Sequence, residues 1–235
     1  MESLPAFSGF PQAGIEFLAN LAAHNERAWF EFHKEEYRTL LLEPAQAFVM
    51  ALGAKLQTLA SDIRIDTRTD GSGVLMRIHR DTRFSKNKTP YKTNISGLFW
   101  EGSAKKTESP AFGFQIDVAG MGLMTGIFKF SPAMLTAYRA AVIDDHLGKE
   151  LESTLKNAGR ADQYEIAGEH YKRVPPGYDL HHSRADLLKY DGLYVFSPRL
   201  QTTDLLTPEL VDVCYAHFQR MTPVYRWLVK VATIK

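Results

Sequence analysis

The chain has a single cysteine, Cys214, among its 235 residues. One cysteine cannot form an internal disulfide bond, so the sequence excludes a disulfide scaffold. A lone thiol also fits a reducing compartment, and we therefore expect the protein to be cytoplasmic. With 45% hydrophobic and 23% charged residues, a chain of this length can bury a sizeable core without disulfides or metal.

Long apolar runs and repetitive segments are also missing. No stretch approaches the roughly 20 apolar residues that cross a bilayer, so we predict no membrane partner. The first ten residues lack a basic region followed by an apolar stretch, and we expect no signal peptide. Without repeats, low-complexity tracts or long Gly/Ser/Pro linkers, the chain is predicted to form one domain over residues 1–235.

An excess of charge of one sign is likewise absent, because 28 Lys and Arg nearly balance 27 Asp and Glu. No global field then draws the protein to nucleic acid, and such an affinity must come from a local patch. Motifs for nucleotide binding and zinc binding are missing too. Residues 85–88 fit the nucleophile motif S-x-x-K, but its companion motifs are absent, so we interpret the match as a coincidence. The eight histidines are scattered, so we expect no metal site and no cofactor. The sequence leaves open whether the protein is an enzyme.

Apolar residues at helical spacing dominate the N-terminal part. Ile15, Leu18 and Ala22 predict one helix. A second helical stretch runs from about residue 26 to residue 60, and Pro44 should break or kink it near residues 42–43. The apolar face after that break consists of Ala45, Phe48, Val49, Leu52, Leu56 and Leu59.

The middle of the chain changes to a period of two, which is typical of strands. The alternation covers residues 74–78 and 112–118, and residues 119–122 are predicted to form a turn into a strand over residues 123–130. With a further strand over residues 95–100, the sequence predicts an antiparallel sheet of at least four strands.

The C-terminal part returns to helical patterns. Ser131 followed by Pro132 is typical of a helix start, and Leu135, Tyr138 and Val142 form the expected buried stripe. A short helix over residues 184–189, a short strand over residues 193–196 and a last helix over about residues 207–229 follow. Helices, then a sheet, then helices predict an α+β fold with the sheet flanked by N-terminal and C-terminal helices.

Positive charge is concentrated in residues 77–92, RIHRDTRFSKNKTPYK, which we call the basic segment. It contains six Lys and Arg, whereas an even distribution would place about two there. Continuing the alternation of residues 74–78 puts Arg80 on the predicted core face and Asp81 on the other face. A guanidinium entering a core needs a partner or a bound anion, because burying it unpaired is costly.

These residues suggest an anion-binding site for a small molecule that carries phosphate or carboxylate. We expect Arg80, Arg83, Lys88 and Lys92 to clamp the anion. Asp81 would orient an arginine or act as a general base, and Tyr91 would add a hydroxyl group and a stacking face. The plainer interpretation is a solvated basic loop with internal salt bridges.

A second basic cluster follows later in the chain. Arg173 and His182 lie in a proline-stiffened stretch, and Arg139 follows Tyr138 on the predicted helix. If these groups face the basic segment, the two clusters form a basic cleft, and otherwise they are merely exposed.

The alternative function is a binding module for nucleic acid or an acidic protein surface. In that case Tyr91, Phe84 and Trp100 would be the stacking groups.

The basic segment and three other parts of the chain form one recognisable pattern. Its most specific part consists of Arg80, Asp81, Arg83, Phe84, Ser85, Lys86, Lys88, Pro90, Tyr91 and Lys92. The others are Asn25, Trp29, Phe30, Lys34 and Tyr37; Tyr138 and Arg139; and Lys172, Arg173, Pro175, Gly177, Tyr178, His182 and residues 187–189. Over about residues 7–200 the chain thus resembles an uncharacterised family, domain of unknown function 2461. The resemblance implies a single α+β domain and supplies no activity.

Overall fold

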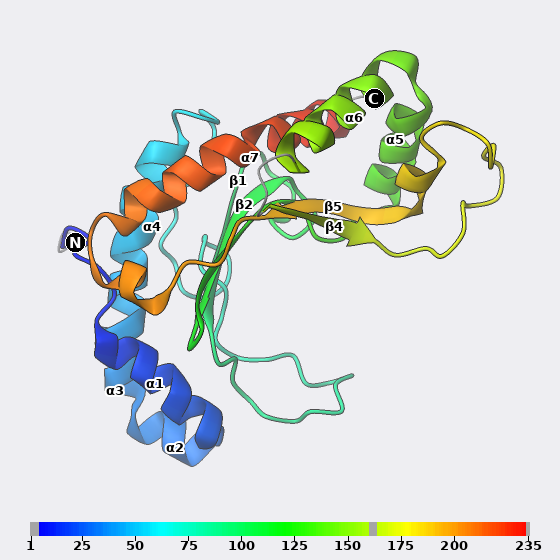
Figure 1. The fold of residues 1–235 in the computed structure, drawn as a ribbon. Coiled ribbons are helices and arrows are strands. Elements are labelled where there is room, and N and C mark those ends of the chain that lie inside the picture. Colours follow the sequence, from blue (N-terminus) through cyan, green and yellow to red (C-terminus); the bar gives the residue numbers. More distant parts are fainter. Residues whose placement is uncertain (1–4, 160–163, 234–235) are drawn as a thin grey trace. The chain divides into compact units, whose positions relative to one another are not determined.

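Figure 1 shows the computed structural model of the chain, which describes residues 5–159 and 164–233. Helices precede and follow a five-stranded antiparallel sheet with the strand order β1-β2-β3-β5-β4, so the predicted α+β class is confirmed. The chain forms two compact units. The first contains residues 1–99, 113–122 and 199–216, and the second contains residues 100–112, 123–198 and 217–235.

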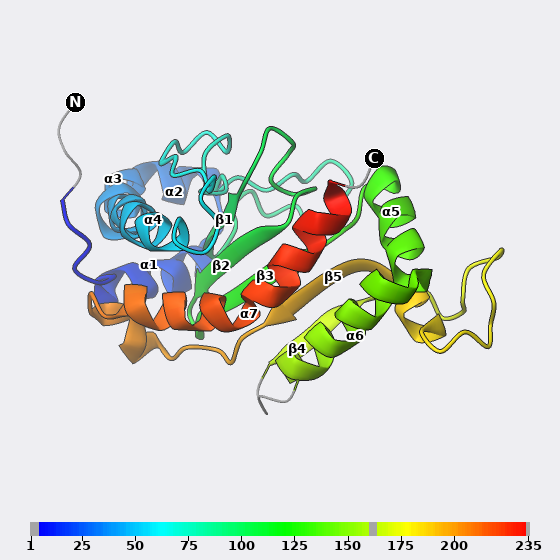
Figure 2. The ribbon, with the colours of Figure 1, turned by 90° about the horizontal axis from the view of Figure 1, so that it is seen from above.

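The N-terminal helices, which are labelled in Figure 2, belong to the first unit. They are α1 (Gln12–Ala23), α2 (Arg27–Phe32), α3 (Lys34–Tyr37), the π-helical η1 (Arg38–Leu42) and α4 (Glu43–Leu56). At the predicted break near residues 42–43 the helix does not end, because the π-helical η1 passes directly into α4 with helical dihedral angles at Leu42 and Glu43. Pro44 lies in the first turn of α4, where it supplies no N–H to the preceding turn.

The core of the first unit joins α4 to the sheet. Phe48 of α4 lies edge-on to Phe114 of β2, with ring centroids 5.2 Å apart. Both side chains are buried, and Phe99 of β1 lies 6.2 Å from Phe114. The first three strands of the chain are β1 (Ile95–Trp100), β2 (Ala111–Asp117) and β3 (Gly120–Ile127). β3 begins and ends about three residues earlier than the pattern predicts.

The predicted strand over residues 74–78 is wrong, because within the described residues this stretch makes only isolated antiparallel bridges. Leu75 pairs with Gly97, and His79 pairs with Tyr91. Between these bridges, residues 76–78 face the longer stretch of residues 92–96. The unequal lengths prevent a continuous ladder, although Val74, Leu75 and Ile78 are buried as strand residues would be.

In the second unit α6 (Asp145–Gly159) packs against β4 (Glu165–Glu169), which pairs with β5 (Tyr190–Phe196), as Figure 1 shows. The unit also contains α5 (Pro132–Ile143) and the later part of α7 (Leu210–Ala232). Ser131 caps α5 as predicted, because its Oγ accepts a hydrogen bond from the Met134 N–H. The predicted short helix is the 3-10 segment η2 (Ala185–Lys189), and another 3-10 segment, η3 (Thr202–Leu206), precedes α7.

Two further features bear on the sequence predictions. No helix among the described residues has the length and apolar character that crossing a membrane requires. Cys214 on α7 is fully buried, and its thiol donates a hydrogen bond to the Met121 sulfur at 3.6 Å. Burial raises the pKa of this thiol, which keeps it protonated and unreactive.

Candidate anion-binding site

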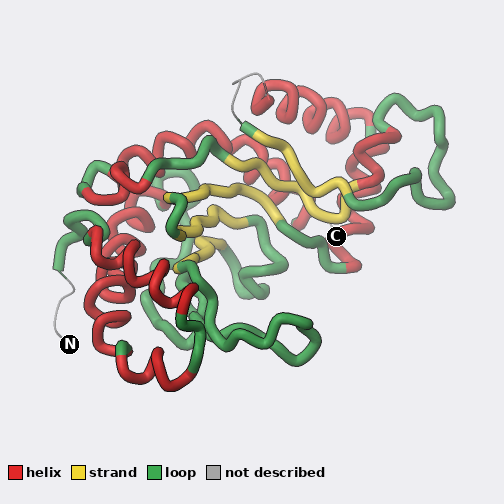
Figure 3. Tube along the Cα trace, turned by 60° about the horizontal axis from the view of Figure 1, so that its bottom comes forward, coloured by secondary structure: helices red, strands yellow, loops and turns green. Residues whose placement is uncertain are grey.

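The basic segment folds as an irregular hairpin in the first unit. The Arg80 N–H donates to the Pro90 carbonyl at 2.9 Å, and the Lys92 N–H donates to the Ile78 carbonyl at 2.8 Å. These bonds close the base of the loop formed by residues 81–89. Figure 3 shows this stretch as a long loop that leaves the sheet and returns to it.

Tyr91 anchors the returning strand and does not reach solvent. Only 2% of the residue is exposed, and its ring stacks on Phe30 of α2 at 4.1 Å. The side-chain amide of Asn25 bonds both backbone groups of Tyr91: it accepts from the N–H and donates to the carbonyl, each at 3.0 Å. Asn25, from the turn after α1, thereby fixes the position of the basic segment.

A hollow of about 310 Å³ lies between this turn and the base of the loop. Arg80 and Lys92 are its two charged residues, and no Asp or Glu is among the described residues that line it. The complete lining is Ala22, Asn25, Arg80, Asn87, Thr89, Tyr91, Lys92, Thr93 and Asn94.

Hydrogen bonds hold the Arg80 guanidinium at the hollow. Its Nη1 donates to Thr89 Oγ1 at 2.5 Å. Thr89 in turn donates from its hydroxyl and its backbone N–H to Asn87 Oδ1, at 2.8 and 2.9 Å. Among the described residues, Arg80 makes no ion pair with a carboxylate, so its charge is not neutralised within the first unit.

Lys92 contributes the second charge from a half-buried position. Burial lowers the pKa of its ammonium group, and the nearby positive charge of Arg77 lowers it further. Both effects disfavour the charged form, as desolvation and like charge do for any lysine. A bound anion would oppose both, which makes Lys92 sensitive to whether the hollow is occupied.

The structure does not bring Arg83, Lys88 or Asp81 to this lining. Arg83 forms a two-pronged ion pair with Asp81, at 3.0 and 2.7 Å. The same guanidinium lowers the pKa of Asp81 to about 2, so this carboxylate is a weak proton acceptor. Lys88 donates instead to the Thr82 carbonyl at 2.9 Å.

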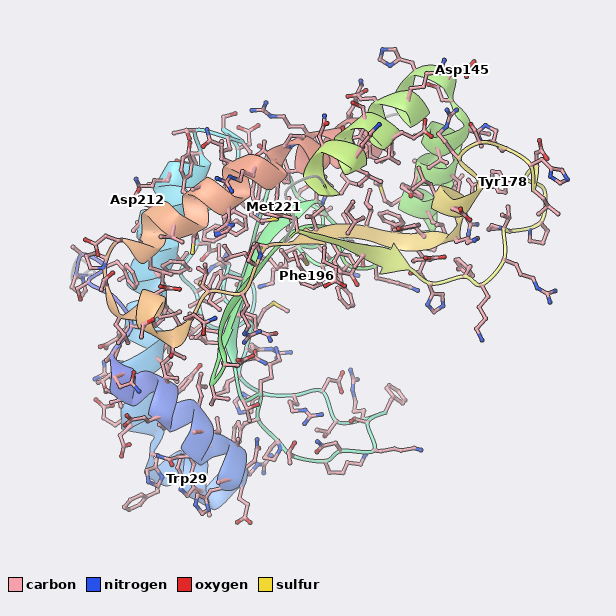
Figure 4. The ribbon with its side chains drawn as sticks, in the orientation of Figure 1. Trp29, Asp145, Tyr178, Phe196, Asp212 and Met221 are labelled. Carbon is pink, nitrogen blue, oxygen red and sulfur yellow. The ribbon has the colours of Figure 1, made fainter. Side chains whose placement is uncertain are left out.

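The second basic cluster belongs to the second unit. The Arg139 guanidinium lies 5.3 Å from the centre of the Tyr171 ring and 6.0 Å from that of Tyr178. Figure 4 marks Tyr178 in the long loop between β4 and η2. Arg173 is exposed, and His182 Nδ1 accepts a hydrogen bond from the Arg184 N–H at 3.1 Å. We describe this cluster separately from the hollow.

The groups considered for stacking on bases differ in accessibility. Tyr91 and Trp100 are 2% and 4% exposed, so neither ring is free to stack on a nucleotide. Phe84, at the tip of the loop, is 96% exposed and lies 6.0 Å from the Arg83 guanidinium.

Sequence reasoning missed four polar residues of the lining, Asn87, Thr89, Thr93 and Asn94. Asn25 belongs to the N-terminal motif, but no role was predicted for it. Asn87 and Thr89 lie between the cationic positions of one short loop, and this position is a signal that would have placed them near the site. No group of three or more His, Cys, Asp or Glu within the described residues is placed to hold a metal ion.

A family model described as "Conserved hypothetical protein (DUF2461)" matches residues 13–227. None of the curated proteins matches the chain.

Proposed function

Because the chain belongs to the family of conserved hypothetical proteins DUF2461, whose description names no reaction, we propose a function from the site itself. The hollow beside the basic segment binds the anionic group of a small molecule that carries phosphate or carboxylate. Arg80 and Lys92 supply the charge, and the neighbouring amide and hydroxyl groups supply further hydrogen bonds. The substrate of any reaction would be held through that group.

One observation carries this proposal: two cationic side chains line one hollow without a carboxylate among the described lining residues. Both side chains are partly buried and have lost some of their hydration, and the positive charge of Arg77 also acts on Lys92. An anion in the hollow would restore favourable electrostatics. The rest of the Arg80 fork is available to it, because within residues 5–159 and 164–233 the guanidinium makes only one hydrogen bond, from Nη1 to Thr89.

The described lining is suited to binding and charge stabilisation more than to proton abstraction. It holds no Asp, Glu, His or Cys. Charge stabilisation of a bound anion is itself a large contribution to group-transfer reactions. We therefore propose that any catalysis here acts on the bound anion, with Lys92 as the group whose protonation is easiest to change.

The experiment compares Arg80→Gln with Arg83→Gln, two variants in which an arginine is replaced by an uncharged glutamine. We expect inorganic phosphate to raise the melting temperature of the wild type and of Arg83→Gln. Arg80→Gln should bind phosphate at least tenfold more weakly, because a charge-assisted hydrogen bond contributes about 1.5–3 kcal/mol. Calorimetric titration gives the affinities. Equal phosphate binding by the wild type and Arg80→Gln would overturn the proposal.

The alternative function, binding of nucleic acid or of an acidic protein surface, is supported by Phe84. This exposed ring beside Arg83 gives the loop one stacking group next to a cation. The burial of Tyr91 and Trp100 removes the other two, so we rank it second. It predicts that single-stranded RNA binds the wild type at low salt and that Phe84→Ala weakens this binding. Undetectable binding in fluorescence anisotropy at low ionic strength would exclude it.

A further inference from the structure

Arg80 and Lys92 leave the backbone on the same face of the hairpin base. Their N–H groups donate across the hairpin on either side of the bridge between His79 and Tyr91. Side chains alternate between the two faces of paired strands, so Arg80 and Lys92 share the face opposite to His79 and Tyr91. Diagonal neighbours of this kind lie roughly 7–8 Å apart, and both of these residues line the hollow.

The amine of Lys92 is partly withdrawn from solvent without an acidic partner among the described residues. Within the same part of the chain, it makes no hydrogen bond and no ion pair. The other two lysines of the basic segment differ, because Lys88 donates to the Thr82 carbonyl and Lys86 is exposed to solvent. Lysines rarely lose contact with water without gaining an acidic partner, so the position of Lys92 calls for a functional reason.

Three features of this position favour the neutral form of the amine. Burial and the positive charge of Arg77 both lower the pKa of Lys92. The described lining holds no Asp or Glu that would oppose these two effects. A neutral amine has a free electron pair, and desolvation or a neighbouring cation is the means by which proteins turn a lysine into a nucleophile.

We propose that Lys92 forms an imine with the carbonyl group of an anionic ligand, while Arg80 holds the carboxylate or phosphate of that ligand. This inference rests on the proposed function and narrows its ligand to anionic aldehydes and ketones. The neutral amine adds to the carbonyl carbon, and the resulting carbinolamine loses water to leave a carbon–nitrogen double bond. Both amine hydrogens and the carbonyl oxygen leave as that water, so the step needs no oxidant or reductant. Arg80 stays charged throughout, so the anion remains bound when Lys92 gives up its proton.

Pyruvate and hydroxyacetone are matched probes for this reaction, because both are small methyl ketones and only pyruvate carries a carboxylate. Cyanoborohydride delivers hydride to the imine carbon and fixes the ligand as a secondary amine, which peptide mapping by mass spectrometry locates. The exposed Lys86 of the same loop reports the intrinsic reactivity of each ketone. We expect pyruvate to label Lys92 at least about tenfold faster than Lys86, because binding holds the carbonyl beside the amine. Hydroxyacetone should show no such preference.

Arg80→Gln and Arg83→Gln test the role assigned to Arg80. Arg80→Gln should reduce the preference of pyruvate for Lys92 by about tenfold, because it removes a charge-assisted hydrogen bond to the carboxylate. Arg83→Gln, whose side chain lies outside the lining, is the matched control and should keep the preference. Lys92→Arg keeps a positive charge without a nucleophile, so the preferred adduct should disappear from the protein.

Labelling and phosphate titration of the wild type together distinguish the outcomes. If the wild type binds phosphate while pyruvate labels Lys92 no faster than Lys86, the inference is overturned and the proposed function stands. If hydroxyacetone prefers Lys92 as strongly as pyruvate does, no anion is selected and the inference is overturned as well. If phosphate does not bind and neither ketone prefers Lys92, both are overturned. These comparisons use only the wild type, so a variant that does not fold leaves the test intact.

Discussion

At the scale of single residues, Lys92 links the electrostatics of the hollow to pH. Its pKa lies below that of an ordinary lysine because of burial first and Arg77 second. A lysine is charged below its pKa and neutral above it. The positive charge of Lys92 is therefore lost at a lower pH than that of an exposed lysine, and anion binding should weaken as the pH rises through this lowered pKa.

Arg77→Gln tests this dependence. Removing the nearby positive charge should raise the pKa of Lys92, and the loss of phosphate affinity should then begin at a higher pH than in the wild type. Calorimetric titration of both proteins over the same alkaline pH series measures the difference, and the ionisation of phosphate cancels in the comparison. Superimposable profiles would mean that Lys92 does not contribute its charge to binding.

The sequence located the basic segment, but it did not show which of its cations share a site. Arg80 and Lys92 reach the hollow because the backbone pairs residues 78–80 with residues 90–92. Arg83 instead bonds Asp81, only two residues away. Such short-range pairing depends on the local course of the loop, and residue spacing alone does not reveal it.

At the scale of secondary structure, Arg184 closes the C-terminal end of α5. Only 5% of the residue is exposed. Its Nε donates to the Val142 carbonyl at 2.6 Å, and its Nη2 donates to the carbonyls of Ile143 and Asp144 at 3.4 and 3.3 Å. Carbonyls at a helix end lack intrahelical partners, and a positive charge there also suits the helix dipole.

Arg184→Leu should therefore destabilise the protein by about 3 kcal/mol, because it leaves buried carbonyls without a hydrogen-bond donor and removes the positive charge beside them. Urea unfolding followed by circular dichroism measures the change. Arg173→Leu, at an exposed position of the same loop, is the control and should change stability by less than about 0.5 kcal/mol. Similar effects of the two substitutions would contradict the capping role.

The predicted elements succeeded where a pattern was long or a start signal was specific. The Ser131-Pro132 start and the alternation in β2 are examples. Neither α6 nor β4 was predicted. β4 pairs only with β5, at the edge of the sheet, and its sequence EIAGE lacks alternation. In α6, Leu147, Leu151 and Leu155 do recur every fourth residue, but charged residues surround them.

At the scale of the whole molecule, the two compact units are not successive segments of the chain. β1, β2, β3 and α7 each contain residues of both units. A strand or helix divided in this way cannot lose its structure in one unit without affecting its continuation in the other. The prediction of a single domain over residues 1–235 therefore implies that the two units unfold cooperatively.

We expect the two units to unfold in one transition. Trp29 lies in the first unit and Trp227 in the second, so variants that retain only one of these tryptophans report on each unit. In each variant, the urea midpoint from fluorescence should coincide with that from far-UV circular dichroism. Midpoints that differ between the two methods would show that the units unfold separately.

The enclosed thiol of Cys214 has a practical consequence for such work. Because it lies against Met121 with no access to solvent, an alkylating reagent can reach it only after α7 separates from β3. The rate at which Cys214 is labelled in native buffer therefore measures how often this part of the protein opens, without any engineered probe.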